Sequence, residues 1–151
     1  MQQNKDIIGQ VERVTFPKLG GASVLARVDT GARTSSISAR ATLLDNGQLE
    51  VTFLGENFSS QPHTFTTFDV VRVASSNGQT ERRYKVKLLV RLAGRSINAH
   101  FTLTDRSSQV YAVLVGRNVL RGKFIVDISQ GSPDKTAEKK RSQELQKRRS
   151  I

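Results

Sequence analysis

The feature that most constrains the fold is a run of alternating residues near the middle of the chain. From Tyr84 to Leu92 every second residue is apolar, and most of the residues between them are basic. Because side chains alternate between the two faces of a β-strand, this period of two predicts a long strand with one buried face. The Asn77-Gly78 pair just before it favours a tight hairpin turn, so a partner strand is expected on the other side of the turn.

The other regular segments of the first 130 residues are also strand-like. They are short, rich in apolar residues and separated by turn signals such as DNGQ at 45–48. We expect strands at residues 7–16, 23–29, 35–44, 49–54, 68–76, 81–92, 96–105, 110–116 and 123–129. Residues 55–67 are polar and predicted to be irregular, whereas 117–122 predict a short helix that ends at Gly122. Many short strands with one short helix indicate an all-β, barrel-like fold.

The composition excludes several kinds of site. The chain has no cysteine, so disulfides, thiolate zinc sites and cysteine nucleophiles are absent. Its two histidines, His63 and His100, are too far apart in sequence to bind zinc from one helical face, and we expect them in a loop and on the polar face of a strand. A Walker-type phosphate loop is also missing. We therefore expect no cofactor, neither zinc nor ATP.

The charge is strongly positive. The 24 lysines and arginines against 13 aspartates and glutamates give +11. Residues 131–151 carry seven of these bases and three of the acids, so we assign 1–130 to one domain and 131–151 to a basic tail that is disordered or a short helix. Few aromatic residues interleave with the bases, so we expect a solvated surface and no nucleic-acid partner.

No membrane or export signal is evident in the sequence. No apolar run approaches the roughly 20 residues that a membrane-spanning helix needs. The first residues, MQQNKDIIG, lack the basic and then apolar pattern of a signal peptide. We expect no membrane partner and take the cytoplasm as the default compartment, with a removed signal peptide left open.

A single carboxylate marks the end of one predicted buried strand. The strand runs into Asp29, and Thr30, Gly31 and Ala32 follow at once. Asp-Thr-Gly alone is a weak signal, because it should occur by chance in roughly one chain in thirty of this length. The context strengthens it, since a second apolar run ends in glycine 87 positions later, at Gly116, and a hairpin lies between them.

This combination resembles the retroviral-type, or retropepsin-like, aspartic peptidases. In that family an apolar strand enters Asp-Thr-Gly-Ala, a flap hairpin follows, and an apolar-apolar-Gly segment precedes Arg-Asn and a short helix. The matching segments are VDTGA at 28–32, VRVASSNGQTERRYKV at 71–86 and VLVGRNVL at 113–120, within a match of about 7–129 that has extra residues at 43–67. The chain resembles more closely a bacterial family of small retropepsin-like domains, often labelled ATP-dependent zinc proteases. The segments that carry this resemblance are IIGQVERV, DTGARTSSISA, SSNGQTERRYKV and VGRNVLRGKFIVD.

The resemblance implies a retropepsin-like acid protease barrel with a flap hairpin and one short C-terminal helix. Such peptidases need two carboxylates that share one proton, because two carboxyls about 3 Å apart cannot both ionise. One acid deprotonates the water and the other polarises the scissile carbonyl. A chain with one motif supplies only Asp29, so the resemblance implies a homodimer with one Asp29 from each subunit at a twofold axis.

The resemblance also implies roles for the residues around Asp29. Thr30 would form a hydrogen bond across the axis, Gly31 would let the substrate backbone approach, and Ala32 would keep the floor of the cleft small. Gly116 would let its strand pass close behind this loop.

The flap and the residue after the motif would contact substrate. Ser76, Asn77 and Gly78 would form the flap tip that closes over an extended peptide. Viral enzymes carry an acid after Asp-Thr-Gly-Ala that pairs with the arginine of Gly-Arg-Asn. Here Arg33 takes that place opposite Arg117, so the two arginines would face one another unless an acid lies between them.

Two acids are candidates to separate these arginines, namely Glu81 and Asp127. Otherwise we expect Asp105 and Asp127 to be structural or surface residues. Arg33 is interpreted either as a structural ion pair or as a contact to an acidic substrate or a C-terminal carboxylate.

The sequence therefore supports three hypotheses. The first is an aspartic endopeptidase of retropepsin type that works as a homodimer on an extended peptide, with a preference for acidic substrates because the cleft would be basic. The second is an inactive peptide-binding module of the same fold. The third is a nucleic-acid binder, for which affinity would fall steeply with salt.

Overall fold

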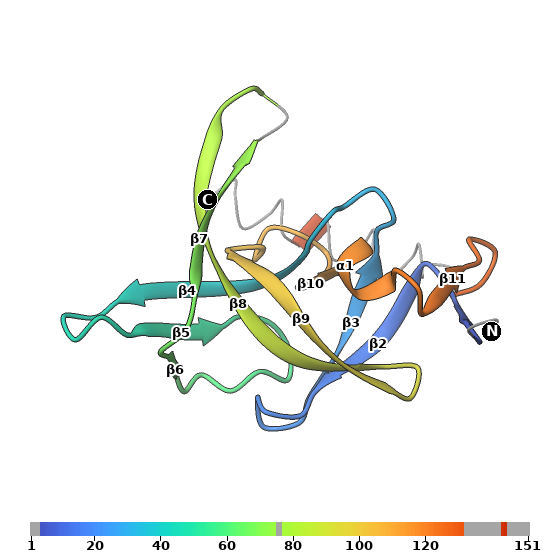
Figure 1. The fold of residues 1–151 in the computed structure, drawn as a ribbon, viewed down its shortest axis with the longest axis horizontal. Coiled ribbons are helices and arrows are strands. Elements are labelled where there is room, and N and C mark those ends of the chain that lie inside the picture. The colour runs from blue at the N-terminus through green and yellow to red at the C-terminus, as the bar shows by residue number, and fades with distance from the viewer. Residues whose placement is uncertain (1–3, 75–76, 132–142, 145–151) are drawn as a thin grey trace.

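The computed structural model describes residues 4–74, 77–131 and 143–144 (Figure 1). Its elements, in chain order, are β1 (Asp6–Ile8), β2 (Val11–Phe16), β3 (Ala22–Val28), β4 (Ser35–Leu43), β5 (Leu49–Phe53), β6 (His63–Phe65), β7 (Asp69–Ala74), β8 (Thr80–Leu92), β9 (Arg95–Thr104), β10 (Val113–Val115), α1 (Arg117–Leu120) and β11 (Phe124–Val126). The predicted all-β architecture with one short helix near the end of the domain is confirmed.

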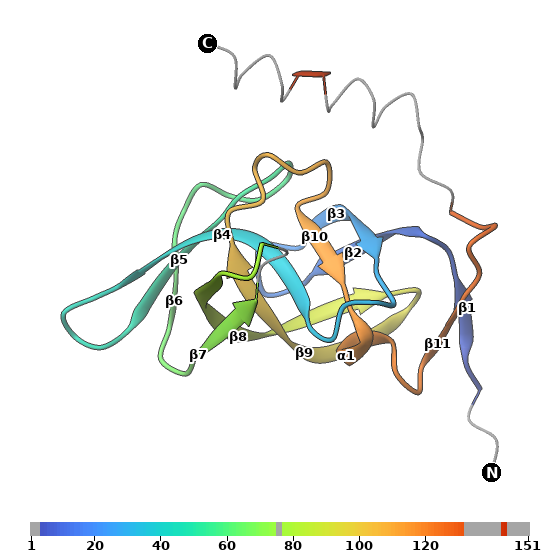
Figure 2. The ribbon, with the colours of Figure 1, turned by 90° about the horizontal axis from the view of Figure 1, so that it is seen from above.

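The main sheet closes into a barrel through the short strand β10. Strands follow one another in the order β10-β3-β2-β8-β9-β4, and β10 also pairs with β4, so the first and last strands of this path are joined directly. The β10–β3 and β4–β9 pairs are parallel and the other pairs in the ring are antiparallel. Figures 1 and 2 show the strands curving around a common interior. Closure gives every strand of the ring two partners.

The alternating run of β8 faces this interior as predicted. Its buried side chains are Val86, Leu88, Val90 and Leu92. Across the core the rings of Phe16 and Phe101 meet edge to face, with centroids 5.6 Å apart. Most of the core therefore comes from the packing of these strands against one another, and α1 adds the buried Val119 and Leu120.

The predicted strand at 7–16 is wrong in one respect, because the structure breaks it at Gly9 and Gln10. The segment before the break, β1, leaves the barrel and pairs in parallel with β11. At Gly9 a Cβ would lie 2.3 Å from the carbonyl oxygen of Gln130, so only glycine allows the two chain segments to approach this closely. The break depends on a contact more than a hundred residues away, which no local pattern records.

The prediction of an irregular 55–67 is also wrong in part. His63–Phe65 form β6, which pairs with β5 and extends the sheet beyond the barrel. The expectation that His63 lies in a loop is corrected with it, since its ring packs edge to face against Phe53 at 5.6 Å. A three-residue strand carries too little periodicity to be seen in sequence, and here pairing with β5 decides its conformation.

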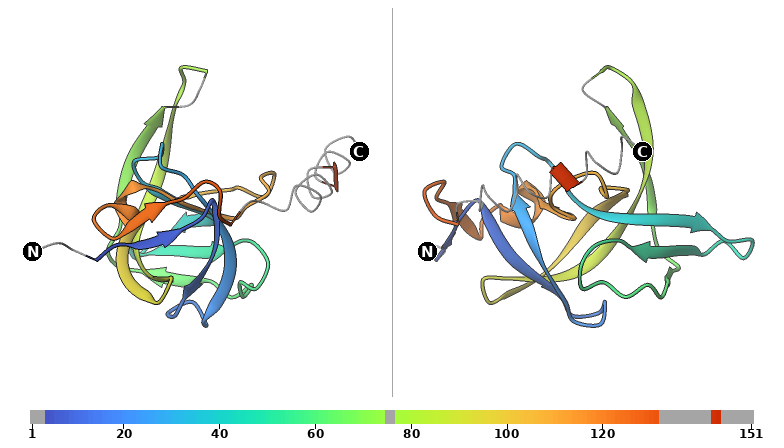
Figure 3. Two further views of the ribbon diagram at one scale, coloured as in Figure 1. Left: turned by 90° about the vertical axis from the view of Figure 1, so that its right-hand side faces the viewer. Right: turned by 180° about the vertical axis from the view of Figure 1, so that it is seen from behind.

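The flap hairpin is formed by β7 and β8, which pair antiparallel from Asp69↔Lys85 to Ala74↔Thr80. It projects beyond the barrel, as Figures 1 and 3 show. Near its tip Gly78 has a φ of +83°, which glycine adopts readily. Ser76, which the sequence assigned to this tip, lies outside the described residues, as do 132–142 and 145–151 of the predicted tail.

In the parts of the chain that the structure describes, every helix is too short or too polar to cross a bilayer.

We expect a core substitution on β8 to destabilise the domain strongly. Leu92 is 1% exposed, so Leu92→Ala should lower the free energy of unfolding by about 2–5 kcal/mol through lost burial and a residual cavity. Urea denaturation measures the change. The matched control is Leu43→Ala at the end of β4, where the side chain is 53% exposed and the change should stay within about 0.5 kcal/mol. Equal losses in the two variants would contradict the placement of the core.

Candidate active site

Asp29 begins the loop between β3 and β4 and is held at the end of β10. Its N–H donates to the carbonyl oxygen of Val115 at 2.8 Å. The N–H of Gly31 donates to Asp29 Oδ1 at 2.9 Å, and the N–H of Ala32 donates to the Asp29 carbonyl at 3.2 Å. These bonds turn the chain sharply and orient one carboxylate oxygen. Within the described residues Oδ2 accepts no hydrogen bond, and the side chain is only partly buried, so this oxygen can meet a water molecule.

Arg117 braces the loop from the start of α1. Its Nη1 donates to the carbonyl oxygens of Thr30 at 3.2 Å and Gly31 at 3.0 Å, while its backbone N–H donates to the Ala32 carbonyl at 2.8 Å. Arg117 therefore holds the loop through backbone carbonyls and needs no acid after the motif. Arg33, in the position of that acid, is exposed.

The two acids proposed to separate these arginines are engaged elsewhere. Glu81 pairs with Arg83 at 3.3 Å on the flap. Asp127 accepts from the hydroxyl and N–H of Ser129, and these bonds hold the pKa of its carboxyl below the usual value. Both are therefore structural contacts of their own segments.

Gly116 brings the chain directly behind the loop. A Cβ on Gly116 would lie 2.8 Å from the Ala32 carbonyl oxygen and 2.9 Å from that of Thr34. Because real Cβ atoms do not approach backbone so closely, the position requires glycine.

A buried network that the sequence reasoning missed ties these segments together. Ser35, which is fully buried, donates from its N–H and its hydroxyl to Asn118 Oδ1 at 2.9 and 2.8 Å. Its hydroxyl also accepts from the N–H of Gly116 at 2.9 Å, and Asn118 Nδ2 donates to the carbonyl of His100 at 2.8 Å. The sequence signal that could have revealed this network is Ser35 at the start of a predicted strand, because a buried hydroxyl needs hydrogen-bond partners.

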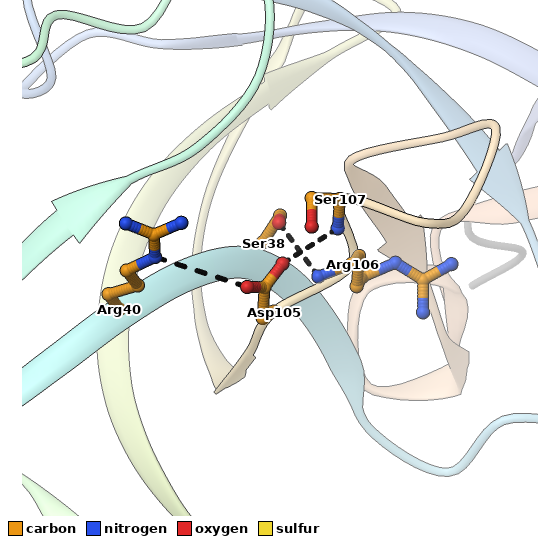
Figure 4. Close-up of polar contacts among 5 residues, drawn as sticks. All are labelled: Ser38, Arg40, Asp105, Arg106 and Ser107. Carbon is orange, nitrogen blue, oxygen red and sulfur yellow. Dashed lines mark hydrogen bonds and ion pairs between the residues drawn. The ribbon is translucent and has the colours of Figure 1, made fainter. Parts of the chain in front are cut away.

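A second polar cluster lies between β4 and the segment that follows β9 (Figure 4). The N–H of Arg106 donates to the hydroxyl of the buried Ser38 at 2.8 Å. Asp105 accepts from the N–H of Ser107 at 2.8 Å and lies 3.9 Å from Arg40. The bonds from Ser107, with a smaller effect of Arg40, lower the pKa of the Asp105 carboxyl. Asp105 thus stabilises its own turn.

The cluster also places a cation in the electrostatic environment of Asp29. Burial lowers the pKa of the Arg106 guanidinium, the charge of Arg83 lowers it further, and the carboxylate of Asp29 opposes both effects. Arg83 and Arg106 were not among the residues singled out from the sequence, because they are 23 positions apart in a chain with 24 basic residues.

The structure thus joins part of the predicted site by direct contacts. Asp29, Gly31 and Ala32 form one loop with Gly116 and Arg117 packed against it. Asn77 and Gly78 lie on the projecting flap, and Gln79 N–H donates to Asn77 Oδ1 at 3.2 Å. Among residues 4–74, 77–131 and 143–144, no three histidine, aspartate or glutamate side chains gather as a metal site would need.

Comparison with solved structures supports the fold. A crystal structure of a Legionella pneumophila protein of unknown function superposes with a TM-score of 0.64 at 24% identity, covering 83% of this chain and 95% of that one. Among curated proteins, a probable alpha-L-glutamate ligase of Shewanella pealeana is 36% identical over 137 residues, or 86% of this chain. One of Desulfotalea psychrophila is 30% identical over 130 residues, or 82% of this chain. The chain spans only 30% and 28% of the length of these two relatives.

A family model identifies the domain itself. The model described as RimB-like, retropepsin-like aspartic endopeptidase RimB, matches residues 7–135. This range includes the flap, and it includes the Asp29 loop and Gly116-Arg117, which meet at one end of β10. The chain therefore belongs to the RimB-like family of retropepsin-like aspartic endopeptidases.

Proposed function

We propose that the protein is an aspartic endopeptidase that hydrolyses peptide bonds with two Asp29 carboxylates, one from each subunit of a homodimer. The observation that carries this proposal is the loop of Asp29, which is fixed by Val115, Gly31 and Arg117 while, among the described residues, its Oδ2 accepts no hydrogen bond. Family membership supports the same chemistry.

In this proposal the two carboxyls share one proton across a bound water. The ionised Asp29 takes a proton from the water, which attacks the scissile carbonyl carbon. The protonated Asp29 donates its hydrogen to the carbonyl oxygen as the tetrahedral intermediate forms. Collapse of the intermediate breaks the C–N bond and passes a proton to the leaving amine. The braced loop contributes by holding each carboxyl at one position, so no reorganisation is needed during the reaction.

The residues around Asp29 take supporting roles in this mechanism. Thr30 braces the two loops across the axis, while Gly31 and Ala32 leave room for the substrate backbone. The flap tip closes over an extended peptide, which pairs with its main chain. Ser76, Asn77 and Gly78 form this tip in the proposal.

The proposed dimer needs a surface for a second copy, and an apolar one adjoins the base of the Asp29 loop. Ile7 and Ile125 are register partners in β1 and β11 and are exposed together with Ile128. Gln10 connects them to the site, since its side chain bonds the Ile128 carbonyl and its own carbonyl accepts from the N–H of Val28 at 2.8 Å. An isolated two-stranded ribbon with exposed isoleucines gains stability from a partner.

For the substrate we propose an acidic peptide. The described relatives that contain a similar domain are named as probable alpha-L-glutamate ligases, so an α-linked glutamate peptide is a fitting test substrate. The net charge of +11 favours attraction of such a peptide at low salt. In this reading the exposed Arg33, four residues after Asp29 in the same loop, contacts a substrate carboxylate.

Removal of the Asp29 carboxylate is the direct test of catalysis. We expect Asp29→Asn to lower kcat by about a thousandfold or more, because an amide can neither deprotonate the water nor share the proton. Cleavage of a library of acidic peptides, followed by mass spectrometry, measures the rate. Asp45→Asn, which makes the same charge change in the exposed β4–β5 turn, is the matched control and should retain activity.

Hydrolysis retained in Asp29→Asn would refute the mechanism. A wild-type protein that binds the acidic peptides without cleaving any of them would instead favour the inactive peptide-binding module.

Dimer formation is tested at the exposed ribbon. We expect Ile125→Asp to raise the dissociation constant of the dimer at least about tenfold, because a charge would be buried in the interface. Sedimentation equilibrium measures this constant. Leu43→Asp is the control, since Leu43 is equally exposed, at 53%, and is the last residue of β4, a strand that ends on the side of the molecule away from β11 (Figure 1). A wild-type protein that remains monomeric at all concentrations, yet cleaves peptides, would contradict the two-carboxylate site.

A further inference from the structure

We propose that the outer face of β2, β8 and β9 binds double-stranded nucleic acid through its phosphate backbone. Three cations on this face, Arg13, Lys87 and Arg91, form what we call the basic row. The inference does not depend on the proposed peptidase activity, because the basic row lies on the wall of the barrel and outside the Asp29 loop.

The basic row faces solvent on the outside of the barrel. Along β8 the buried apolar side chains alternate with Lys87 and Arg91, which are exposed on the opposite face of the strand. Arg13 is exposed in the same way next to the buried Val14 of β2. Because β2, β8 and β9 are neighbours in the sheet, their outward sides form one continuous surface (Figure 1).

The strand register places the three cations in a row. Arg91 is the register partner of Thr15, two residues from Arg13, so Arg13 and Arg91 are diagonal neighbours about 7–8 Å apart. Lys87 is separated from Arg91 by about 13 Å, the length of four residues of a strand. A duplex carries one phosphate charge for about every 1.7 Å of its axis, so a duplex along this row presents several phosphates to it.

The protein leaves the basic row without a neutralising acid. Among the described residues no member of the row forms an ion pair. Arg13 makes two long contacts of 3.5 Å with Ser23, and these bring no negative charge. Across the β8–β9 pair, Lys87 lies opposite His100 and Arg91 lies opposite Ser96. The face therefore offers unneutralised cations to an anion.

The polar residues beside the row suit phosphate oxygens. Ser96, Asn98 and His100 are exposed at alternate positions of β9, and side chains of these types donate hydrogen bonds to the nucleic-acid backbone. Binding of lysine and arginine to phosphates also releases counterions, which favours association at low salt. Contacts of this kind do not read the base sequence.

The lack of aromatic residues on this face favours a duplex over a single strand. Single-strand binding proteins stack the bases on aromatic side chains, and the outward positions of β2 and β9 and of β8 from Lys87 to Arg91 carry no phenylalanine, tyrosine or tryptophan. The expectation of no nucleic-acid partner rested on the same scarcity of aromatic residues. That argument counts against single strands, whereas a duplex keeps its bases stacked inside and presents only phosphates and grooves.

The shape of the face favours a duplex over other polyanions. The wall of a closed barrel is convex, so a narrow row of cations meets a rod better than it meets the plane of a membrane. An acidic peptide would lose conformational freedom when it is ordered on an exposed surface. A duplex is already stiff over the length of the row.

Salt-dependent binding of a duplex tests the proposal. Fluorescence anisotropy of a labelled DNA duplex of about 20 base pairs, titrated with the full chain between about 50 and 200 mM KCl, gives the association constant. Three phosphate contacts predict a slope of log K against log salt of about −2.7 or steeper. Arg13→Gln, Lys87→Gln and Arg91→Gln should each weaken binding at least about threefold at the lowest salt and make the slope shallower by about 0.9, whatever the duplex sequence.

The matched control is Arg121→Gln, which removes one positive charge at an exposed position just after α1 and should leave the slope unchanged. Thermal melts check that all variants fold. Asp29→Asn should bind the duplex as tightly as the parent protein, because the Asp29 loop is not part of the face.

Several results would overturn the proposal. They are undetectable duplex binding at the lowest salt, tighter binding of a single strand of the same length, and equal losses in all four charge variants. Hexaglutamate or phosphatidylserine vesicles that depend on the basic row more strongly than the duplex does would assign the face to a peptide or a membrane instead. Loss of duplex binding in Asp29→Asn would move the nucleic acid to the cleft and refute this face.

Discussion

The site depends on the two-sided pairing of β10. This three-residue strand pairs with β3 on one side and β4 on the other, which closes the barrel. The same strand ends at Val115, whose carbonyl receives the N–H of Asp29, and continues into Gly116 and Arg117, which contact the Asp29 loop. One short segment thus provides both the closure of the fold and the floor of the candidate site. Any shift of β10 would change the direction of the Asp29 carboxylate.

The charged residues around the site are arranged differently from those of the viral pattern. An acid after the motif would neutralise the arginine of Gly-Arg-Asn, but Arg33 stands in its place and Arg117 binds backbone carbonyls instead. The remaining acids nearby stabilise their own turns or pair within the flap. Glu81, Asp105 and Asp127 are thus engaged within their own segments, which is one reason why we propose an acidic substrate.

Much of the fold was predictable because its signals are local. The alternation in β8 predicts which face of that strand is buried, and the apolar run of β10 predicts that this strand is buried. The hairpin pairs, such as Asn77-Gly78, predict where the chain turns. The short strand β6, the break at Gly9 and the bonds of Ser35 were missed, since each depends on a partner far away in sequence. At the site, spacing placed Asp29 and Gly116 at the ends of strands. The network of Ser35, Asn118 and Gly116 appears only when those segments are packed.

The sequence by itself determined the strand pattern, the single Asp-Thr-Gly motif and, through that single carboxylate, the expectation of a second copy of the chain. These follow from residue types and short spacings, which local sterics and solvation translate directly into structure. The tertiary structure decided which backbone groups hold the Asp29 loop, that Arg117 braces it without an acid, and that Ser35, Asn118 and Gly116 share one buried network. Such contacts join residues that are tens of positions apart, and only the closed barrel brings them within bonding distance.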